Sequence, residues 1–259
     1  MMFHETNEKT MTAENIERWR YPRFFTENVG ETALITNDDA KHITAVLRMK
    51  KGEKAVLCDN NGFDYLSELL EASRDFAEFK ILEKRENAAE PNVEIRLFQC
   101  IPKADKMDYI VQKATELGVS AVIPVLSKRC VSRPDEKSSG KKIQRYQKIA
   151  EEAAKQCGRG KIPTVYPLAA FSDAVKEFSP ERLGILFYEC GGISLSKALS
   201  PATRHIDIFI GSEGGFAQEE AEMADKCGIK LATLGNRILR CETAPVAAIA
   251  ILMNLTGNM

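Results

Sequence analysis

Ile210-Gly211-Ser212-Glu213-Gly214-Gly215-Phe216 places three glycines in five positions, directly after an apolar run. Glycine has no Cβ, so the backbone of such a loop can take positive φ angles and approach a ligand closely. The stretch lacks the G-x-G-x-x-G pattern and is not followed by G-K-[ST], so it is neither a dinucleotide fingerprint nor a phosphate loop. Taken alone, it is more typical of a simple turn from a strand into a helix.

A second unusual connection is Leu234-Gly235-Asn236-Arg237-Ile238-Leu239-Arg240-Cys241-Glu242-Thr243-Ala244. Structure alone would favour small polar residues in a turn, yet here two arginines and a glutamate accompany two bulky apolar residues. Thr243 or Glu242 can cap the helix that follows, and Pro245 suits its first turn. Capping leaves the residues from Arg237 to Arg240 unexplained, so this loop indicates a functional site.

Both loops lie in a part of the chain where predicted strands and helices alternate. After Asn92 the pattern predicts strands at 94–101, 121–125, 183–188, 206–210 and 231–234, and helices at 106–117, 139–157, 218–227 and 243–255. This alternation predicts an α/β domain with a mainly parallel sheet that is covered on both faces. Ligands of such sheets bind beyond the carboxyl ends of the strands, where both loops would lie.

The preceding part of the chain has a different pattern. Strands are predicted at 32–36, 54–59, 63–70 and 76–83, and Asn60-Asn61-Gly62 suits a hairpin turn. Asp38 would cap a helix that runs to Met49. We therefore expect a small β-rich domain, closed by a linker near residues 87–92. Residues 1–20 lack an apolar period and are interpreted as a polar extension, with a short helix over 13–20.

Charge is unevenly distributed, although the formal net charge is only -1. Residues 96–161 hold 15 Lys and Arg against 7 Asp and Glu, a net charge of +8, whereas residues 21–95 hold 10 against 15, a net charge of -5. A polyanion would be attracted to the basic segment.

No apolar run reaches the roughly 18 residues of a membrane helix and no signal peptide is recognisable, so we expect a cytoplasmic protein. The seven scattered cysteines form no C-x-x-C pair, so we expect neither structural zinc nor a disulfide framework.

Together, the two loops resemble the SPOUT class of methyltransferases, and specifically the RsmE-type 16S rRNA uracil-N3 methyltransferases. The family pattern resembles I-G-P-E-G-G-F followed by L-G-x-R-I-L-R-x-E-T-A, and residues 210–216 and 234–244 match it. This chain departs from the pattern at Ser212, where the family usually has Pro, and at Cys241, where Thr is common. Residues 22–25, 106–118 and 151–159 also resemble family segments, so the resemblance covers nearly the whole chain after residue 20.

The resemblance implies an N-terminal PUA-like β-rich barrel that binds RNA and a C-terminal α/β SPOUT domain knotted as a trefoil. We place the polar extension at 1–20, the PUA-like domain at 21–90 and the methyltransferase domain at 91–259. The implied enzyme uses S-adenosyl-L-methionine to methylate N3 of a uridine in small-subunit ribosomal RNA, uridine 1498 in the family. It would work as a homodimer, without a metal or a membrane. The apolar helix over 246–253 suits a dimer interface or the central helix of a monomer almost equally well.

By carry-over from the family, the cofactor would lie on the two loops. Arg240 is our candidate for stabilising the uracil anion, and Glu242 or Glu213 are weaker candidates for the proton acceptor. His42 and His205 are interpreted as structural. The residues assigned to cofactor binding are Gly211, Glu213, Gly214, Gly215, Leu234, Gly235, Asn236, Ile238, Leu239 and Thr243.

The basic segment would supply most contacts to RNA phosphates. The helix over 139–157 has Tyr146 and Ala150 on one face and lysines and arginines on the other, which fits a solvated face or an RNA-binding one. The residues assigned to RNA binding are Arg23, Lys103, Lys106, Arg129, Arg133, Lys141, Lys142, Arg145, Arg159 and Lys161.

Two alternatives remain open from the sequence. A SPOUT enzyme could act on tRNA or on another atom of the same RNA, because the loops describe the cofactor rather than the target. An RNA-binding assembly factor that has lost catalysis would keep the same fold, although the intact R-I-L-R-x-E-T-A stretch argues against it. A small-molecule methyltransferase is disfavoured, because it would have little use for the β-rich domain and the basic segment.

Overall fold

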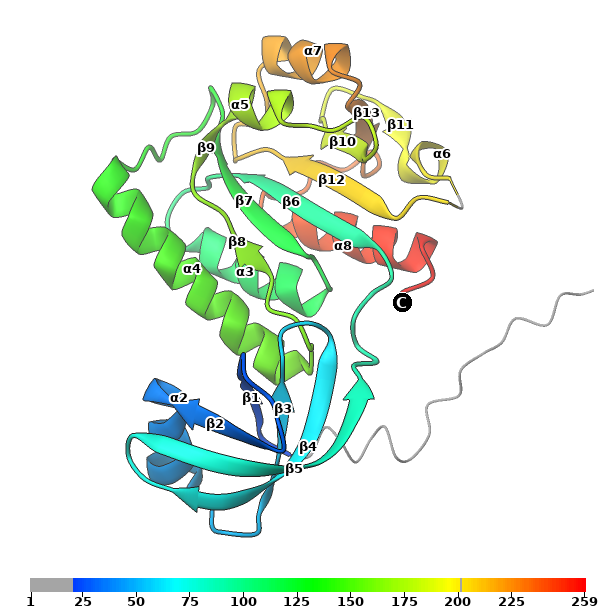
Figure 1. Cartoon of the computed structure of the whole chain (residues 1–259). Coiled ribbons are helices and arrows are strands. Elements are labelled where there is room, and N and C mark those ends of the chain that lie inside the picture. The colour runs from blue at the N-terminus through cyan, green and yellow to red at the C-terminus, as the bar shows by residue number, and fades with distance from the viewer. Residues whose placement is uncertain (1–20, 201) are drawn as a thin grey trace, which may run out of the picture. The chain divides into compact units, whose positions relative to one another are not determined.

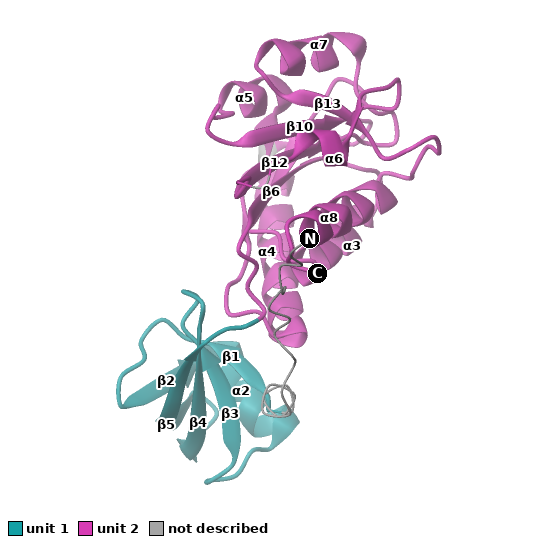
Figure 2. Ribbon diagram, turned by 90° about the vertical axis from the view of Figure 1, so that its right-hand side faces the viewer, with its two compact units in different colours: residues 1–88 teal, residues 89–259 magenta. Residues whose placement is uncertain are grey.

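The computed structural model describes residues 21–200 and 202–259, so the helix predicted over 13–20 lies outside the described residues. The chain divides between Ala88 and Ala89 into two compact units, which Figure 2 shows in different colours. Unit 2 carries both of the loops that the sequence singles out.

Unit 1 is built on a five-stranded sheet. Every neighbouring pair is antiparallel except β1 and β3. Its core packs Phe24, Leu57 and Phe79 against Ile43 of the helical segment. The strands are β1 (Arg23–Phe25), β2 (Thr32–Thr36), β3 (Lys54–Cys58), β4 (Phe63–Ala72) and β5 (Phe76–Glu86), in the order β1-β3-β4-β5-β2.

Two local predictions in unit 1 have different outcomes. The hairpin turn is confirmed, because Asn60 and Gly62 have φ angles of 60° and 97° between β3 and β4. The predicted helix through Met49 is confirmed as a helical segment over residues 37–47, but its cap and its regularity differ from the prediction. Thr36 occupies the N-cap, α2 spans Asn37–Lys41, and a π-helix, η1, continues over His42–Leu47. Asp38 instead pairs with Lys41 on the surface, and Arg48 takes a left-handed conformation that ends the segment.

Unit 2 is an eight-stranded parallel sheet with helices on both faces, as Figure 1 shows. The predicted α/β architecture is confirmed. The strand order is β11-β13-β10-β12-β6-β7-β8, and β9 pairs with β7. The strands are β6 (Glu94–Cys100), β7 (Ala121–Leu126), β8 (Thr164–Val165), β9 (Ala169–Ala170), β10 (Leu183–Phe187), β11 (Ile193–Ser194), β12 (His205–Ile210) and β13 (Lys230–Thr233).

The helices of unit 2 fall into two sets, which bury opposite faces of the sheet. One face packs Ile95 and Ile208 against α3 (Lys106–Glu116), α4 (Glu136–Cys157), α6 (Leu195–Ala198) and α8 (Thr243–Leu255). The other face packs Phe98 and Phe209 against α5 (Phe171–Lys176) and α7 (Gln218–Lys226). The short elements β8, β9, α5, β11 and α6 were absent from the sequence prediction, because two to six residues are too few to show a period.

The amino end of the sheet is held by a buried ion-pair network. The Asp207 carboxylate is fully buried and accepts bonds of 2.7 Å from Arg96 Nε and 2.7 Å from Arg182 Nε. Arg182 also donates to Glu94 over 2.8 Å. This network lies at the opposite end of the strands from the two loops, so it stabilises the sheet rather than the site.

Within the described residues, no helix is long and apolar enough to cross a membrane.

Candidate active site

The two loops meet because their strands are near neighbours in a parallel sheet. β12 ends at Ile210 and β13 ends at Thr233, and β10 pairs with both of them. β6 pairs with the other side of β12, so the turn after Cys100 reaches the same edge. The two loops therefore lie at the same edge of the sheet, on either side of β10, where open parallel sheets bind ligands.

The first loop is a tight turn whose three glycines lie close to neighbouring atoms. Gly215 has a φ of 64°, and a Cβ there would lie 2.3 Å from Glu189 Oε1. A Cβ on Gly211 would meet Gly215 Cα at 2.9 Å, and one on Gly214 would meet Arg129 Cβ at 2.9 Å. Ser212 is buried and its hydroxyl lies 3.5 Å from the Arg129 carbonyl oxygen. Tight packing thus explains these glycines in part, as the simple-turn interpretation expects.

The second loop is more open. Gly235 has a φ of 98°, and a Cβ built on it would meet no described atom within 4 Å, so a ligand can approach this backbone. Leu234 and Leu239 are partly buried, whereas Ile238 is 87% exposed. Asn236 and Thr243 are also exposed. An apolar side chain so exposed beside an open backbone is suited to contact with a bound molecule.

Glu242 does not cap α8 with its side chain, although it occupies the N-cap position. Its Oε2 instead lies 3.2 Å from Lys106 Nζ and accepts a bond of 3.1 Å from Cys241 Sγ. Glu213 of the first loop lies 3.0 Å from the same Lys106 Nζ and accepts a bond of 3.1 Å from Lys103 N. One ammonium group therefore joins the two glutamates predicted as proton acceptors.

Both glutamates are ionised at neutral pH. Burial alone would raise the pKa of Glu213, but bonds from its own backbone N–H, from Lys106 and from Lys103 outweigh burial and lower it. The Cys241 thiol, and then Lys106, hold the pKa of Glu242 below its usual value. Burial, with Glu242 beside it, raises the pKa of Cys241 to about 12, so the thiol stays protonated and donates. An ionised carboxylate can accept a proton, which the predicted role requires.

The backbone of Arg240 is held by hydrogen bonds, whereas its side chain is exposed. Its carbonyl oxygen accepts bonds of 2.9 Å from Thr243 N and 2.9 Å from Ala244 N, which fixes the end of the loop. Its side chain is exposed and makes no hydrogen bond or ion pair to any residue that the structure describes. The guanidinium is therefore available to a bound group.

The structure divides the residues assigned to RNA binding. Arg23 pairs with the buried Asp64 over 2.7 Å, and Arg159 is 4% exposed, so we leave both out of the RNA surface. Lys106 belongs to the glutamate cluster. Arg129 donates to the Gly214 carbonyl oxygen over 2.9 Å, and Arg133 donates to the Ser127 and Lys128 carbonyl oxygens. The assigned residues that are at least partly exposed outside that cluster are Lys103, Arg129, Arg133, Lys141, Lys142, Arg145 and Lys161.

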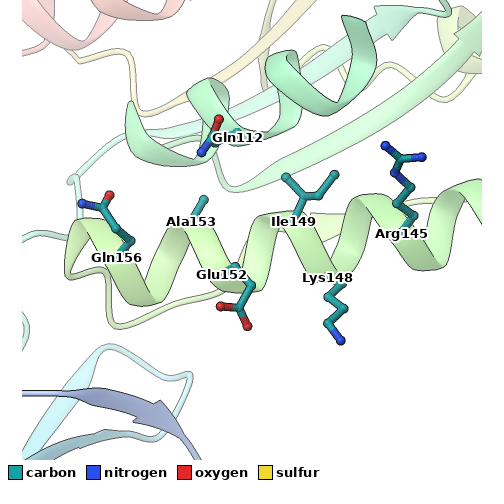
Figure 3. A pocket seen from close by; sticks show the side chains of 7 residues that line it. All are labelled: Gln112, Arg145, Lys148, Ile149, Glu152, Ala153 and Gln156. Carbon is teal, nitrogen blue, oxygen red and sulfur yellow. The ribbon is translucent and has the colours of Figure 1, made fainter. Parts of the chain in front are cut away.

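A groove of about 610 Å³ follows α4 where it faces α3, as Figure 3 shows. Gln112 of α3 faces Arg145, Ile149 and Gln156 of α4 across it. None of the residues of the two loops lines this groove. It is therefore separate from the candidate site, although it shares Arg145 with the basic surface.

Comparison of the chain with known protein families identifies the family of the protein. Residues 89–253 match the model of an RNA methyltransferase domain, and residues 35–82 match that of an RNA methyltransferase PUA domain. The ribosomal RNA small subunit methyltransferase E of Bacillus subtilis is 33% identical over 229 residues, which cover 85% of this chain and 89% of that protein. The chain belongs to the ribosomal RNA small subunit methyltransferase E family.

Other members of the methyltransferase E family match over nearly their full length. The one from Buchnera aphidicola of Acyrthosiphon pisum is 29% identical over 251 residues, covering 95% of this chain and 98% of that protein. The crystal structure of the methyltransferase E of Neisseria gonorrhoeae, bound to S-adenosyl methionine, has a TM-score of 0.84 at 32% identity. It covers 91% of this chain and 98% of the other. The predicted family, the PUA-like and α/β fold class and the RNA methyltransferase activity are confirmed.

Sequence reasoning missed the partner of the glutamates. Lys106 was assigned to RNA because it lies in the basic segment, and its contacts with Glu213 and Glu242 span more than 100 residues of chain. The charge total of the segment includes Lys106 but gives no sign of these contacts. Among the described residues, no group of His, Cys, Asp and Glu could hold a metal ion.

Proposed function

We propose that this methyltransferase transfers a methyl group from S-adenosyl-L-methionine to N3 of a uridine in 16S ribosomal RNA, uridine 1498 by family resemblance. The reaction would take place in the cytoplasm, with the small ribosomal subunit or its RNA as substrate. The observation that carries the proposal is that Lys106 joins Glu213 to Glu242 at the edge of the sheet, in loops of which the second also carries the exposed Arg240.

The residues of the two loops fit the cofactor. The open backbone at Gly235 allows close approach, and Leu239 and Ile238 offer apolar surface beside it. Gln99 Oε1, in the side chain whose Nε2 donates to the Gly211 carbonyl oxygen, is buried without a hydrogen-bond partner among the described residues. Bound S-adenosylmethionine would supply a methyl group activated by a sulfonium.

The protein must then make uracil N3 a nucleophile. N3 carries a proton on the base-pairing edge, so the base must be unpaired or flipped to reach the site. Glu213 or Glu242 would accept that proton, and the N3 lone pair left behind would form the new bond to the methyl carbon. The bond from that carbon to the sulfonium sulfur would break at the same time, and its electron pair would stay on sulfur in the departing thioether. Arg240 would stabilise the negative charge that the uracil gains, because a fixed cation favours the anion more than the neutral base.

Mapping of modified nucleosides tests the whole proposal. RNA from cells with and without the gene is digested and analysed by mass spectrometry. We expect one 3-methyluridine of 16S rRNA to disappear with the gene and to return with the wild-type copy. Loss of a methyl group from tRNA would instead identify the protein as a SPOUT enzyme that acts on tRNA. Unchanged RNA together with cofactor binding by the purified protein would favour the inactive assembly factor.

We infer that three cations in the first half of α4, Lys141, Lys142 and Arg145, contact RNA phosphates. All three are at least partly exposed, and Arg145 also pairs with Asp108. Changing Lys141, Lys142 and Arg145 to Ala should flatten the dependence of RNA affinity on salt, because each lost phosphate contact contributes a slope of about 0.7 to 0.9. Titrations at several salt concentrations measure the slope. The control removes three exposed lysines from other helices, Lys176, Lys197 and Lys226. An equal slope for the two triple variants would indicate that the α4 cations face solvent and do not contact RNA.

We also propose a homodimer through α8. This helix buries Ala248 and Ile249 against its own domain, while Ile251 remains 41% exposed and Leu255 46% exposed. Ala248 is fully buried inside the monomer, so a charge that tests the interface belongs at Ile251. Ile251→Glu should shift the protein from dimer to monomer in sedimentation, because two buried carboxylates would face a symmetric interface. Met223→Glu, on the exposed part of α7, should remain a dimer. A dimer in both variants would place the interface elsewhere.

The trefoil knot implied by the family is likewise our proposal for the end of unit 2. β13 enters the sheet between β10 and β11, which both precede it in the chain. After the second loop, α8 returns to pack with α3 on one face of the same sheet. This return beneath the cofactor loops supports a threaded chain.

A further inference from the structure

The first residue of α3, Lys106, occupies a place that the stability of its helix does not explain. The amino end of a helix carries partial positive charge, so a lysine there is mildly unfavourable for the helix itself. The next lysine on α3, Lys113, has an ordinary role, because it pairs with Glu116 one turn along over 2.7 Å. Lys106 instead reaches two glutamates that are remote in the chain.

The contacts of Lys106 tie three segments together at one atom. Its Nζ lies 3.0 Å from Glu213 Oε1 in the loop after β12 and 3.2 Å from Glu242 Oε2 in the loop after β13. It also lies 3.7 Å from Cys241 Sγ. Lys103 N, in the turn that leads into α3, donates to both carboxylate oxygens of Glu213 over 3.1 and 3.3 Å. The start of α3 is thus attached to both loops of the proposed site.

Charge makes this arrangement depend on the lysine. Two carboxylates that share one ammonium group must lie close to each other, and like charges at such a distance repel. All three side chains are about one quarter to one third exposed, so water screens this repulsion only in part. Without the ammonium group, the repulsion would favour separation of the two carboxylates, through movement of the loops or rotation of the side chains, or the binding of a proton.

We propose that Lys106 is a positioning residue for methyl transfer, which holds the loops of residues 211–216 and 234–242 together through Glu213 and Glu242. This role deepens the proposed function and rests on it for its effect on turnover. It replaces the assignment of Lys106 to RNA phosphates. Lys106 acts through the two glutamates and need not touch the cofactor or the uridine.

Three variants test the proposal. Lys106→Met removes the ammonium group and keeps most of the stem, whereas Lys106→Arg restores a cation that can donate to two carboxylates. Lys113→Met is the control, because Lys113 is an ion-paired lysine on the same helix with a similar side-chain exposure, 33% against 32%. Hydrogen exchange of both loops is measured on the protein without cofactor, and single-turnover methylation is measured at saturating cofactor.

We expect Lys106→Met to speed exchange in both loops and to lower single turnover by about tenfold or more, since small misplacements of a site are costly. Lys106→Arg should recover most of both losses, and Lys113→Met should change neither. Adding Glu242→Gln to Lys106→Met should slow loop exchange again, because it removes the repulsion.

Other outcomes would overturn the proposal. Unchanged exchange in both loops of Lys106→Met would show that the cluster does not hold them. Slower turnover with unchanged exchange and no rescue by Arg would make Lys106 a direct contact of substrate. If the wild-type protein methylates no RNA while the exchange results follow the expected order, the proposed function and the role of Lys106 in turnover both fail, and only the attachment of the two loops through Lys106 stands.

Discussion

Arg240→Ala should lower single-turnover methylation by roughly a hundredfold or more while leaving the fold and most of the cofactor affinity intact. The size follows from the loss of one preorganised group aimed at charge that develops in the transition state. Stability should be spared, because the side chain is exposed and contacts none of the described residues through a hydrogen bond or ion pair. Turnover and cofactor binding are measured on the same preparation.

Two further variants at the same loop sharpen this expectation. Arg240→Lys should recover little, because an ammonium group lacks the planar fork that can address a uracil carbonyl and a second acceptor together. Arg237→Ala removes another exposed arginine of the loop and should leave turnover near wild type. Loss of cofactor binding with turnover preserved at saturation would make Arg240 a cofactor ligand instead. Equal effects of Arg237→Ala and Arg240→Ala would leave only a general effect of charge.

The sequence was sufficient to single out the two loops, which the fold brings to one edge of the sheet, because both loops are locally unusual. An Arg-Ile-Leu-Arg run inside a connection conflicts with ordinary turn chemistry, and that conflict is visible without a structure. The helical period likewise placed Tyr146 and Ala150 on the buried side of α4, and both are buried. These predictions succeeded because each depends on residues within one or two turns of each other.

Predictions that depended on distant partners were less successful. The position of Glu242 suits a helix cap, but its side chain forms an ion pair with Lys106 of another helix instead. The exposed stretch at Asp38 fits a regular capped helix, yet the chain forms a π-helix over His42–Leu47 that buries Ile43 against Phe24 and Leu57. A charge count along the chain also assumes that every arginine is exposed, whereas some arginines are buried in the structure.

Arg159 is the clearest case of a cation whose role the fold decides. It is 4% exposed, and its Nε and Nη2 donate to the two Glu90 carboxylate oxygens over 3.2 and 3.0 Å. Its Nη1 donates to the carbonyl oxygens of Thr115 and Val119 over 3.2 and 2.6 Å. One side chain therefore joins the end of α3, the end of α4 and the start of unit 2.

Arg159→Ala should lower the free energy of unfolding by about 3–5 kcal/mol, because it leaves the largely buried Glu90 carboxylate without its cation. The backbone N–H groups of Gly160 and Lys161 still donate to Glu90, but they carry no charge to balance it. That loss is a large share of the roughly 5–15 kcal/mol that stabilises a folded protein. Urea unfolding followed by circular dichroism measures it. Part of the loss should return on adding Glu90→Gln, because the unpaired charge is then removed.

Lys161→Ala is the matched comparison, because Lys161 is an exposed cation two residues away. It should change stability by less than about 0.5 kcal/mol and reduce the salt slope of RNA binding by about one. Arg159→Ala, measured at a temperature where it is folded, should leave that slope unchanged. A stable Arg159→Ala protein with a reduced slope would return Arg159 to the RNA surface and would mean that its bonds to Glu90 contribute little to the fold.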